Sequence, residues 1–309
     1  MNVYRYMDDS PKFTNAVLTI GTFDGVHLGH QRIIGRIREL AAKEEGESVL
    51  LTFHPHPRQV LHPEDDSLRL IQTLDERIAS LEHYGIDNLI IGTFSNEFAL
   101  TQPEDYVREF LVSKINPKAI VIGYNHRFGI DRTGDVELMK RLGAELGFSV
   151  HLITKEELDH ISISSTRIRT ALTEGDIDLA NKLMGHAFEL SGTVIRGNGM
   201  GAQLGFPTAN IFVEDKTKLI PGTGVFAVLV DYKDKTYKGM LYIGFRPTFS
   251  GSEKSIEVNV FDLDETLYGE TLKLRLMTRL RGDMKFDSGE HLSRQLGKDK
   301  QHALAVLSG

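Results

Sequence analysis

Residues 16–30 read AVLTIGTFDGVHLGH, and this stretch decides the fold of the first half of the chain. Its apolar start, residues 16–20, has the length and composition of a strand that is buried on both faces. Glycines at positions 21, 25 and 29 allow a tight turn and a close approach of the backbone to a ligand. Apolar residues from Ile33 to Ala41 then repeat with helical spacing. This order predicts an anion site at the start of the helix.

The same alternation of strand and helix continues along the first half. Short runs rich in Val, Ile and Leu predict further strands at residues 48–53, 88–92, 119–123 and 148–153. Helix patterns at residues 75–84 and 135–146 each begin with Asp and are followed by Gly, which are common cap residues. Strands and helices at this spacing predict a parallel, doubly wound α/β sheet of the Rossmann-like type.

The second half has a different pattern. Strands are expected at residues 190–195, 225–231, 237–243, 255–261 and 271–280, and no helix-length segment separates them. Apolar and polar residues alternate in several of them, as in antiparallel strands with one buried face. Residues 233–235, KDK, suit a hairpin turn. We expect a small antiparallel β-barrel or sandwich, closed by a final helix at about residues 288–307.

The domain boundary is expected between residues 173 and 189, where a short helix at 176–184 could form the linker. We therefore predict two domains, residues 1–185 and residues 186–309, which suits a length of 309 residues. A net charge of -7 argues against nucleic acid or an anionic membrane as a partner. The chain has no cysteine, no long apolar run and no signal-peptide pattern at its start, so a cytoplasmic location is expected.

Histidines mark the first candidate site. His27 and His30 stand at the expected helix start, where both could donate hydrogen bonds to a phosphate, and His54 and His56 follow the second strand. The same spacings could belong to a zinc site. Phosphate is favoured because the glycines suit it and no pattern for a fourth metal ligand is evident.

A second polar run, ISSTRIR at residues 163–169, lies near the end of the predicted first domain. Ser164 or Ser165 could cap a following helix. Hydroxyl groups together with Arg167 and Arg169 at a helix start could also hold a polyphosphate.

These two motifs together resemble the nucleotidylyltransferase superfamily. The form GTFDGVHLGHQ, with FHPHP and GYNHRFG, is similar to the adenylyltransferase module of the bifunctional riboflavin kinase/FAD synthetases. The resemblance implies that His27 and His30 stabilise charge at the α-phosphate of ATP, and that residues 165–169 hold the β- and γ-phosphates. The ATP-binding residues that it implies are Gly21, Phe23, Asp24, His27, His30, Ser165, Thr166 and Arg169.

The resemblance also places His56 and Asn125 close to the nucleotide or flavin. Many relatives have an aromatic residue after the position of Asn125, whereas this chain has His126.

The second half carries a glycine-rich run, GNGMGA at residues 197–202, which formally matches a dinucleotide-binding fingerprint. That interpretation is rejected because the fingerprint must open a helix, whereas a loop and turn are expected through GFPTAN at residues 205–210. The run GMGAQLGFPTAN, together with segments 222–227, 237–249 and 257–269, resembles the riboflavin kinase module.

By this second resemblance, Thr208 and Asn210 bind Mg²⁺ and the ATP phosphates, and Glu257 is the general base on the ribityl hydroxyl of the flavin. The ATP-binding residues that it implies are Gly197, Gly199, Gly205, Thr208 and Asn210. From its own sequence surroundings, Glu257 could equally be an outward-facing strand carboxylate.

The chain is therefore expected to be a bifunctional enzyme that converts riboflavin to FMN and FMN to FAD, with ATP as co-substrate. Three alternatives stay open at this point: an adenylyltransferase whose barrel only binds, a nucleotidylyltransferase for another phosphorylated acceptor, and a non-catalytic flavin- or RNA-binding barrel. The oligomeric state is open.

Overall fold

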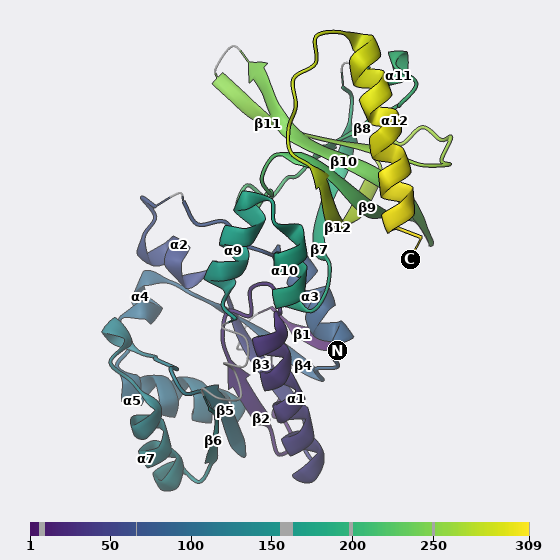
Figure 1. Cartoon of the computed structure of the whole chain (residues 1–309). Coiled ribbons are helices and arrows are strands. Elements are labelled where there is room, and N and C mark those ends of the chain that lie inside the picture. Colours follow the sequence, from purple (N-terminus) through teal and green to yellow (C-terminus); the bar gives the residue numbers. More distant parts are fainter. Residues whose placement is uncertain (6–9, 66, 155–162, 198–199, 249–250, 309) are drawn as a thin grey trace. The chain divides into compact units, whose positions relative to one another are not determined.

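In the computed structural model, which describes residues 1–5, 10–65, 67–154, 163–197, 200–248 and 251–308, the chain folds into two units (Figure 1). Unit 1 consists of Met1–Leu68 and Leu74–Ser164, and unit 2 of Arg69–Thr73 and Ser165–Gly309. Unit 2 therefore takes a short piece of chain from within the first half. The domain boundary after residue 185 stays a prediction.

Unit 1 is built on a parallel sheet with the strand order β1-β4-β3-β2-β5-β6. Its strands are β1 (Asn2–Tyr4), β2 (Val17–Ile20), β3 (Ser48–His54), β4 (Asn88–Thr93), β5 (Ala119–Gly123) and β6 (Ser149–Ile153). Five of these strands match the predicted runs to within one residue at each end. The sequence pattern does not predict β1, because this strand has three residues at the sheet edge and they are largely exposed.

Helices cover both faces of this sheet. The longer ones are α1 (Leu28–Lys43), α3 (Leu74–His83) and α7 (Val136–Leu146), and each confirms a predicted helix. The Asp135 side chain caps α7 by accepting from the N–H of Leu138 at 2.9 Å, and Gly147 ends it with φ 86°. The shorter ones are α2 (Pro57–Leu61), α4 (Asn96–Ala99), α5 (Pro103–Asp105), η2 (Tyr106–Val112), α6 (Ser113–Ile115) and η3 (Ile130–Arg132).

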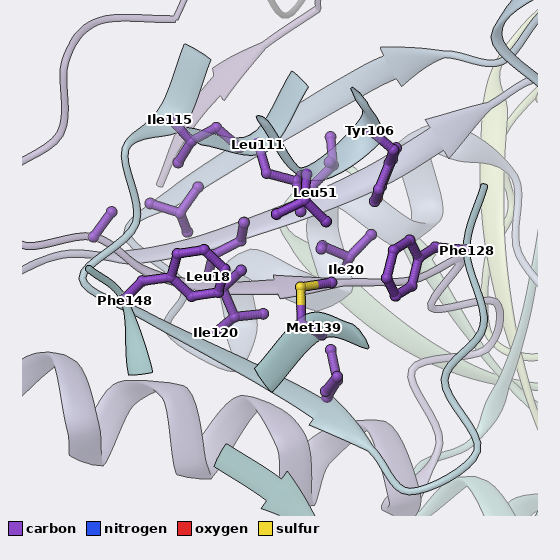
Figure 2. Close-up of a cluster of buried hydrophobic side chains, with 14 of the residues drawn as sticks. Leu18, Ile20, Leu51, Tyr106, Leu111, Ile115, Ile120, Phe128, Met139 and Phe148 are labelled. Atoms are coloured by element: carbon purple, nitrogen blue, oxygen red, sulfur yellow. The ribbon is translucent and has the colours of Figure 1, made fainter. Parts of the chain in front are cut away.

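Two apolar clusters hold the helices to the sheet. On one face, Ile34 and Ile37 of α1 pack against β2, β3 and β4 with Leu81 of α3. On the other face, Leu111 of η2 and Met139 of α7 pack against the same strands, as Figure 2 shows. Since both faces are covered, the strands are apolar throughout rather than alternating.

The strand order reverses direction between β2 and β5, which pair directly. In doubly wound sheets, ligands bind beyond the carboxyl ends of the strands at this point. The turns that follow β2 and β5 begin at Gly21 and Tyr124. The topology therefore places the turn with His27 at the expected ligand site of unit 1.

Unit 2 begins with α9 (Ser165–Glu174) and α10 (Ile177–Met184) and continues into a closed antiparallel barrel. Around the barrel the strand order is β10-β11-β8-β7-β12-β9. Its elements are β7 (Phe188–Ile195), α11 (Met200–Gln203), β8 (Ala209–Phe212), β9 (Gly224–Tyr232), β10 (Lys235–Thr248), β11 (Gly251–Val260), β12 (Thr271–Arg281) and α12 (Gly289–Val306). A barrel, rather than a sandwich, is thus the fold of the second half.

The expected hairpin turn is confirmed, because β9 ends at Tyr232, β10 starts at Lys235, and Lys233 has φ 52°. The prediction of a loop and turn through residues 205–210 is wrong at its end, where Ala209 and Asn210 begin β8. This short strand pairs with both β7 and β11 and so completes the barrel. Its tertiary pairing, rather than its local sequence, makes it a strand.

Alternation along the barrel strands separates two faces. Leu241 of β10 lies opposite Phe226 and Val258, and all three are fully buried on the face that fills the barrel. The next residue, Tyr242, lies opposite Glu257 on the other face. Helix α12 packs on that outer side, where Val225, Ala227, Met240 and Ala303 form an apolar cluster.

The piece of chain from the first half, Arg69–Thr73, pairs with the residues after β8. The backbone N–H of Leu70 donates to Thr217 at 2.7 Å, and the N–H of Leu219 donates to Leu70 at 2.8 Å. Between them, the buried Lys218 ammonium donates to the carbonyls of Ile71 at 2.7 Å and Glu189 at 2.6 Å. Residues 69–73 are therefore an integral part of unit 2.

Candidate active sites

The turn after β2 has an unusual backbone. Phe23 and Val26 have φ 48° and 32°, and Gly25 between them has φ 85°. Phe23 and Asp24 are buried, and the N–H of Gly21 donates to the carbonyl of Leu51 on β3 at 3.0 Å. Left-handed backbone at a β-branched residue such as Val26 is strained, and such strain gathers at functional sites.

His27 and His30 lie together at the start of α1. The N-cap residue is His27, whose Nδ1 accepts from the N–H of His30 at 3.3 Å. The two imidazole rings stack with centroids 3.7 Å apart, and the ring of Phe23 lies 4.7 Å from that of His30. Both histidines thus lie at the start of α1, as predicted. A helix N-terminus is a place where anions bind in other proteins, so the phosphate site stays a prediction here.

The electrostatics keep His30 neutral. Burial, followed by the nearby charges of His27 and Arg77, holds the pKa of His30 well below its ordinary value. Its Nδ1 is buried and lacks a hydrogen-bond partner among the described residues. A neutral imidazole can present one N–H donor to a phosphate oxygen.

Sequence reasoning missed Arg77 of α3, which is 2% exposed. Its guanidinium donates to the carbonyl of Thr22, in the turn after β2, and to Oγ1 of Thr52 on β3. A lone arginine in an amphipathic helix pattern gives no signal of such burial. The position becomes visible only when α3 is packed on the sheet.

The two residues that the resemblance places near the nucleotide or flavin, His56 and Asn125, differ from each other in their surroundings. His56 is the N-cap of α2, and its Nδ1 accepts from the N–H of Arg58 at 3.1 Å. Asn125 is exposed in the turn after β5. Its neighbour His126 stacks against Phe128 with ring centroids 5.9 Å apart, and burial lowers the pKa of His126 to about 4.

The polar run at residues 163–169 starts a helix, as predicted. Ser165, Thr166 and Arg169 lie in the first half of α9, and Nε of Arg169 donates to the carbonyl of Arg69 at 2.9 Å. These residues belong to unit 2, whereas the structure gathers Gly21, Phe23, Asp24, His27 and His30 in unit 1.

The second site lies between the outer face of the barrel and α12. The hydroxyl of Thr208 donates to Oε2 of Glu257 at 3.1 Å, and Ser255 donates to Oε1 at 3.0 Å. Asn210 lies directly opposite Glu257 in the pairing of β8 with β11. The structure therefore brings together the three residues that sequence analysis singled out in this half.

A cavity of about 490 Å³ adjoins these residues. Thr208 and Glu257 line it together with apolar side chains from β9, β10 and α12 and from the segment before that helix. The apolar lining residues include Leu204, Phe206, Val225, Met240, Phe286, Leu292 and Leu296. The polar lining residues also include Tyr242, Asn259, Arg281 and Asp283. A mostly apolar cavity with a few polar groups is typical of a small-molecule site.

The three glycines of this half that are predicted to bind ATP are Gly197, Gly199 and Gly205. The side chain of Asn210 lies against Gly197, so closely that a Cβ there would be 1.9 Å from Nδ2. Gly205 has φ 81°, a conformation that favours glycine. Gly199 lies outside the described residues. Contrary to expectation, a short helix, α11, begins inside the rejected dinucleotide fingerprint at Met200. The rejection still stands, because the motif lies in a β-barrel and not in a βαβ unit.

The part of the chain that the structure describes contains no group of three or more His, Cys, Asp or Glu residues arranged to hold a metal ion. It also contains no helix that is long and apolar enough to cross a membrane.

Two family models match this chain, one in each half. The FAD synthetase family model matches residues 9–167, and the riboflavin kinase family model matches residues 184–307. The bifunctional riboflavin kinase/FMN adenylyltransferase of Bacillus subtilis is 35% identical over 95% of this chain and 93% of its own length. The chain belongs to this bifunctional family.

Other relatives extend the likeness. The bifunctional riboflavin kinase/FMN adenylyltransferase of Escherichia coli is 32% identical over 92% of this chain and 90% of its own length. A crystal structure described as a macrolide-efflux protein from Streptococcus pneumoniae is 32% identical, with a TM-score of 0.88 and 97% of each chain covered. The family is one of ATP-dependent kinases and adenylyltransferases.

Proposed function

We propose that this chain phosphorylates riboflavin to FMN and then adenylylates FMN to FAD. The observation that carries the proposal is the contact of Thr208 with Glu257 in the lining of a mostly apolar cavity, with Asn210 opposite Glu257 in the strand pairing. We assign adenylyl transfer to residues 1–185 and the kinase to residues 186–309. The substrates are then the small molecules riboflavin, FMN and ATP, and the cytoplasmic location stays a prediction.

In the kinase reaction, the ribityl hydroxyl oxygen attacks the γ-phosphorus of ATP and the bond to the ADP oxygen breaks. The hydroxyl proton passes to a base, and we assign this role to Glu257. Hydrogen bonds from Thr208 and Ser255 fix both oxygens of this carboxylate. A carboxylate held in one orientation suits a transfer that depends mainly on positioning.

The residues around Glu257 also suit a divalent cation. The hydroxyl of Thr208 and the amide oxygen of Asn210 are neutral oxygen ligands of the kind that Mg²⁺ accepts alongside phosphate oxygens and water. We propose that these two residues hold Mg²⁺ with the ATP phosphates. When bound, the cation would neutralise charge on the phosphates.

The apolar cavity supports flavin as the kinase substrate. An isoalloxazine ring is flat and has an apolar dimethylbenzene edge, to which Phe206, Met240 and Phe286 around the cavity offer apolar contact area. The ribityl chain is polar and must reach Thr208 and Glu257, which line the same cavity. The cavity thus has the polarity that a flavin with its ribityl chain requires.

In the adenylyl transfer, a phosphate oxygen of FMN attacks the α-phosphorus of ATP, and pyrophosphate leaves. The attacking oxygen carries no proton, so no protein base or nucleophile is needed. We propose that His27, His30 and the N-terminus of α1 stabilise the charge that develops on the α-phosphate. Ser165, Thr166 and Arg169 hold the leaving phosphates, while His56 and Asn125 lie near the nucleotide or flavin.

A barrel that only binds flavin is the second candidate function. It is disfavoured because a binding protein would not need a carboxylate held by two hydroxyl groups beside a third polar residue. The two functions are separated by incubating the protein with riboflavin and MgATP and following FMN and FAD by chromatography. Appearance of FMN and then FAD supports the proposal, and absence of both products contradicts it.

A further inference from the structure

Arg77 is buried beneath the first site, yet the reaction proposed above gives it no role. It lies on α3, and 2% of its surface is exposed. Burial lowers its pKa, while the charge of Asp24 acts in the opposite direction. Burying a guanidinium is costly unless it is paired and hydrogen-bonded, so the contacts of Arg77 need an explanation.

Those contacts converge on one carbonyl group. Nη1 of Arg77 donates to the carbonyl of Thr22 at 2.5 Å and to Oγ1 of Thr52 at 3.3 Å. Oγ1 of Thr52 also donates to the same carbonyl at 3.2 Å. Helix α3, strand β3 and the turn after β2 are therefore tied together at Thr22.

The turn that begins at Thr22 is strained and leads directly to the predicted phosphate site. Phe23 and Val26 have φ 48° and 32°, and left-handed backbone at such residues persists only where the surroundings determine it. His27 follows at once, and its position sets the stacking with His30. The strained turn needs interactions that hold it in place, and the hydrogen bonds of Arg77 to Thr22 and Thr52 are of this kind.

We propose that Arg77 is a positioning residue for adenylyl transfer, which holds the strained turn of residues 22–26 so that His27 and His30 face the α-phosphate. The inference rests on the proposed function of this site. Arg77 acts through the turn, because its Nη1 is engaged with Thr22 and its side chain is buried. A second effect is electrostatic, since its fixed positive charge lies close enough to His30 to lower the pKa of that imidazole.

The test compares variants of the full chain in FAD formation from supplied FMN and MgATP. Arg77→Met is expected to lower kcat on the order of 10²-fold, because displacement of reacting groups by about 1 Å has that effect. KM for FMN should change less than about twofold. Arg77→Lys retains the charge but not the planar donor group, so its kcat should lie between those of Arg77→Met and the unaltered chain. Arg36→Met, at an exposed arginine of α1, is the matched control and should leave kcat unchanged.

Phosphorylation of riboflavin by the same sample reports that unit 2 is folded and should be unaffected, since the kinase residues lie in unit 2. Thermal unfolding of the same sample reports whether unit 1, which contains Arg77, is folded. A merely structural role would lower the melting temperature while leaving kcat per folded molecule unchanged, and this result would overturn the inference. If Arg77→Met does not fold, Thr52→Val and Arg77→Lys serve as the test variants. A wild-type kcat for FAD formation in both of these variants would overturn the inference. If the unaltered chain forms no FAD, the proposed function fails instead.

Discussion

Replacing Gly197 with alanine tests the kinase site through a single methyl group. The new Cβ would lie 1.9 Å from Nδ2 and 2.6 Å from Cγ of Asn210, whereas ordinary contacts begin at about 3.4 Å. The Asn210 amide must therefore move by about 1.5 Å, because the difference between 3.4 and 1.9 Å has to be made up. A displacement of about 1 Å costs on the order of 10²-fold in rate, so FMN formation should fall at least that far.

The measurement is the initial rate of FMN formation from riboflavin and MgATP. FAD formation from supplied FMN in the same sample should stay unchanged, because that reaction is assigned to the first site. Gly297→Ala is the matched control, since a Cβ at position 297 of α12 meets nothing within 4 Å. A Gly197→Ala protein that forms FMN at the wild-type rate would show that the position of Asn210 does not matter, and would refute the reasoning.

Three further predictions concern single side chains. Glu257→Gln should lower the rate of FMN formation by about 10²- to 10⁴-fold and leave FAD formation from supplied FMN unchanged. The control, Glu265→Gln at an exposed carboxylate, should change neither rate. Equal loss of both activities in a folded Glu257→Gln protein would contradict separate sites. His30→Ala should slow FAD formation on the order of 10²-fold, and unchanged rates would remove His30 from the mechanism. Because its pKa is depressed, His30 is neutral at pH 7, so the pH profile of FAD formation should show no step from it at its ordinary value near 6.5. Asp299→Ala removes the buried ion pair with Arg281, whose charged atoms lie 2.9 Å apart, and should lower the free energy of unfolding, measured in urea, by about 3–5 kcal/mol. The control, Glu290→Ala at the exposed pair with Arg294, should lower it by less than about 1 kcal/mol.

The order of elements could be predicted because runs of apolar residues in strands and capping residues at helix ends are strong local patterns. Strands β2 to β6 and helix α7 are of this kind. Strand β8 could not, since it becomes a strand through its pairing with β7 and β11. The edge strand β1 is too short to show a period.

The residues of the candidate sites also differ in whether the sequence alone predicts them. His27, Thr208 and Glu257 lie in motifs with a recognisable spacing, and the sequence alone singles them out. Arg77 lies in an ordinary amphipathic pattern, and its burial depends on how α3 packs against the turn after β2. Side chains that act through the backbone of another element leave no mark in local sequence.

The strand-like contact of residues 69–73 with unit 2 limits how the chain can be divided. If the chain were cut once near the predicted boundary after residue 185, the kinase fragment would lack these five residues. Lys218 would then lose the carbonyl of Ile71, and a buried ammonium that loses an acceptor costs several kcal/mol. Supplying residues 69–73 as a separate peptide should therefore stabilise such a kinase fragment. These residues belong to unit 2 although they precede the range assigned to the kinase, residues 186–309.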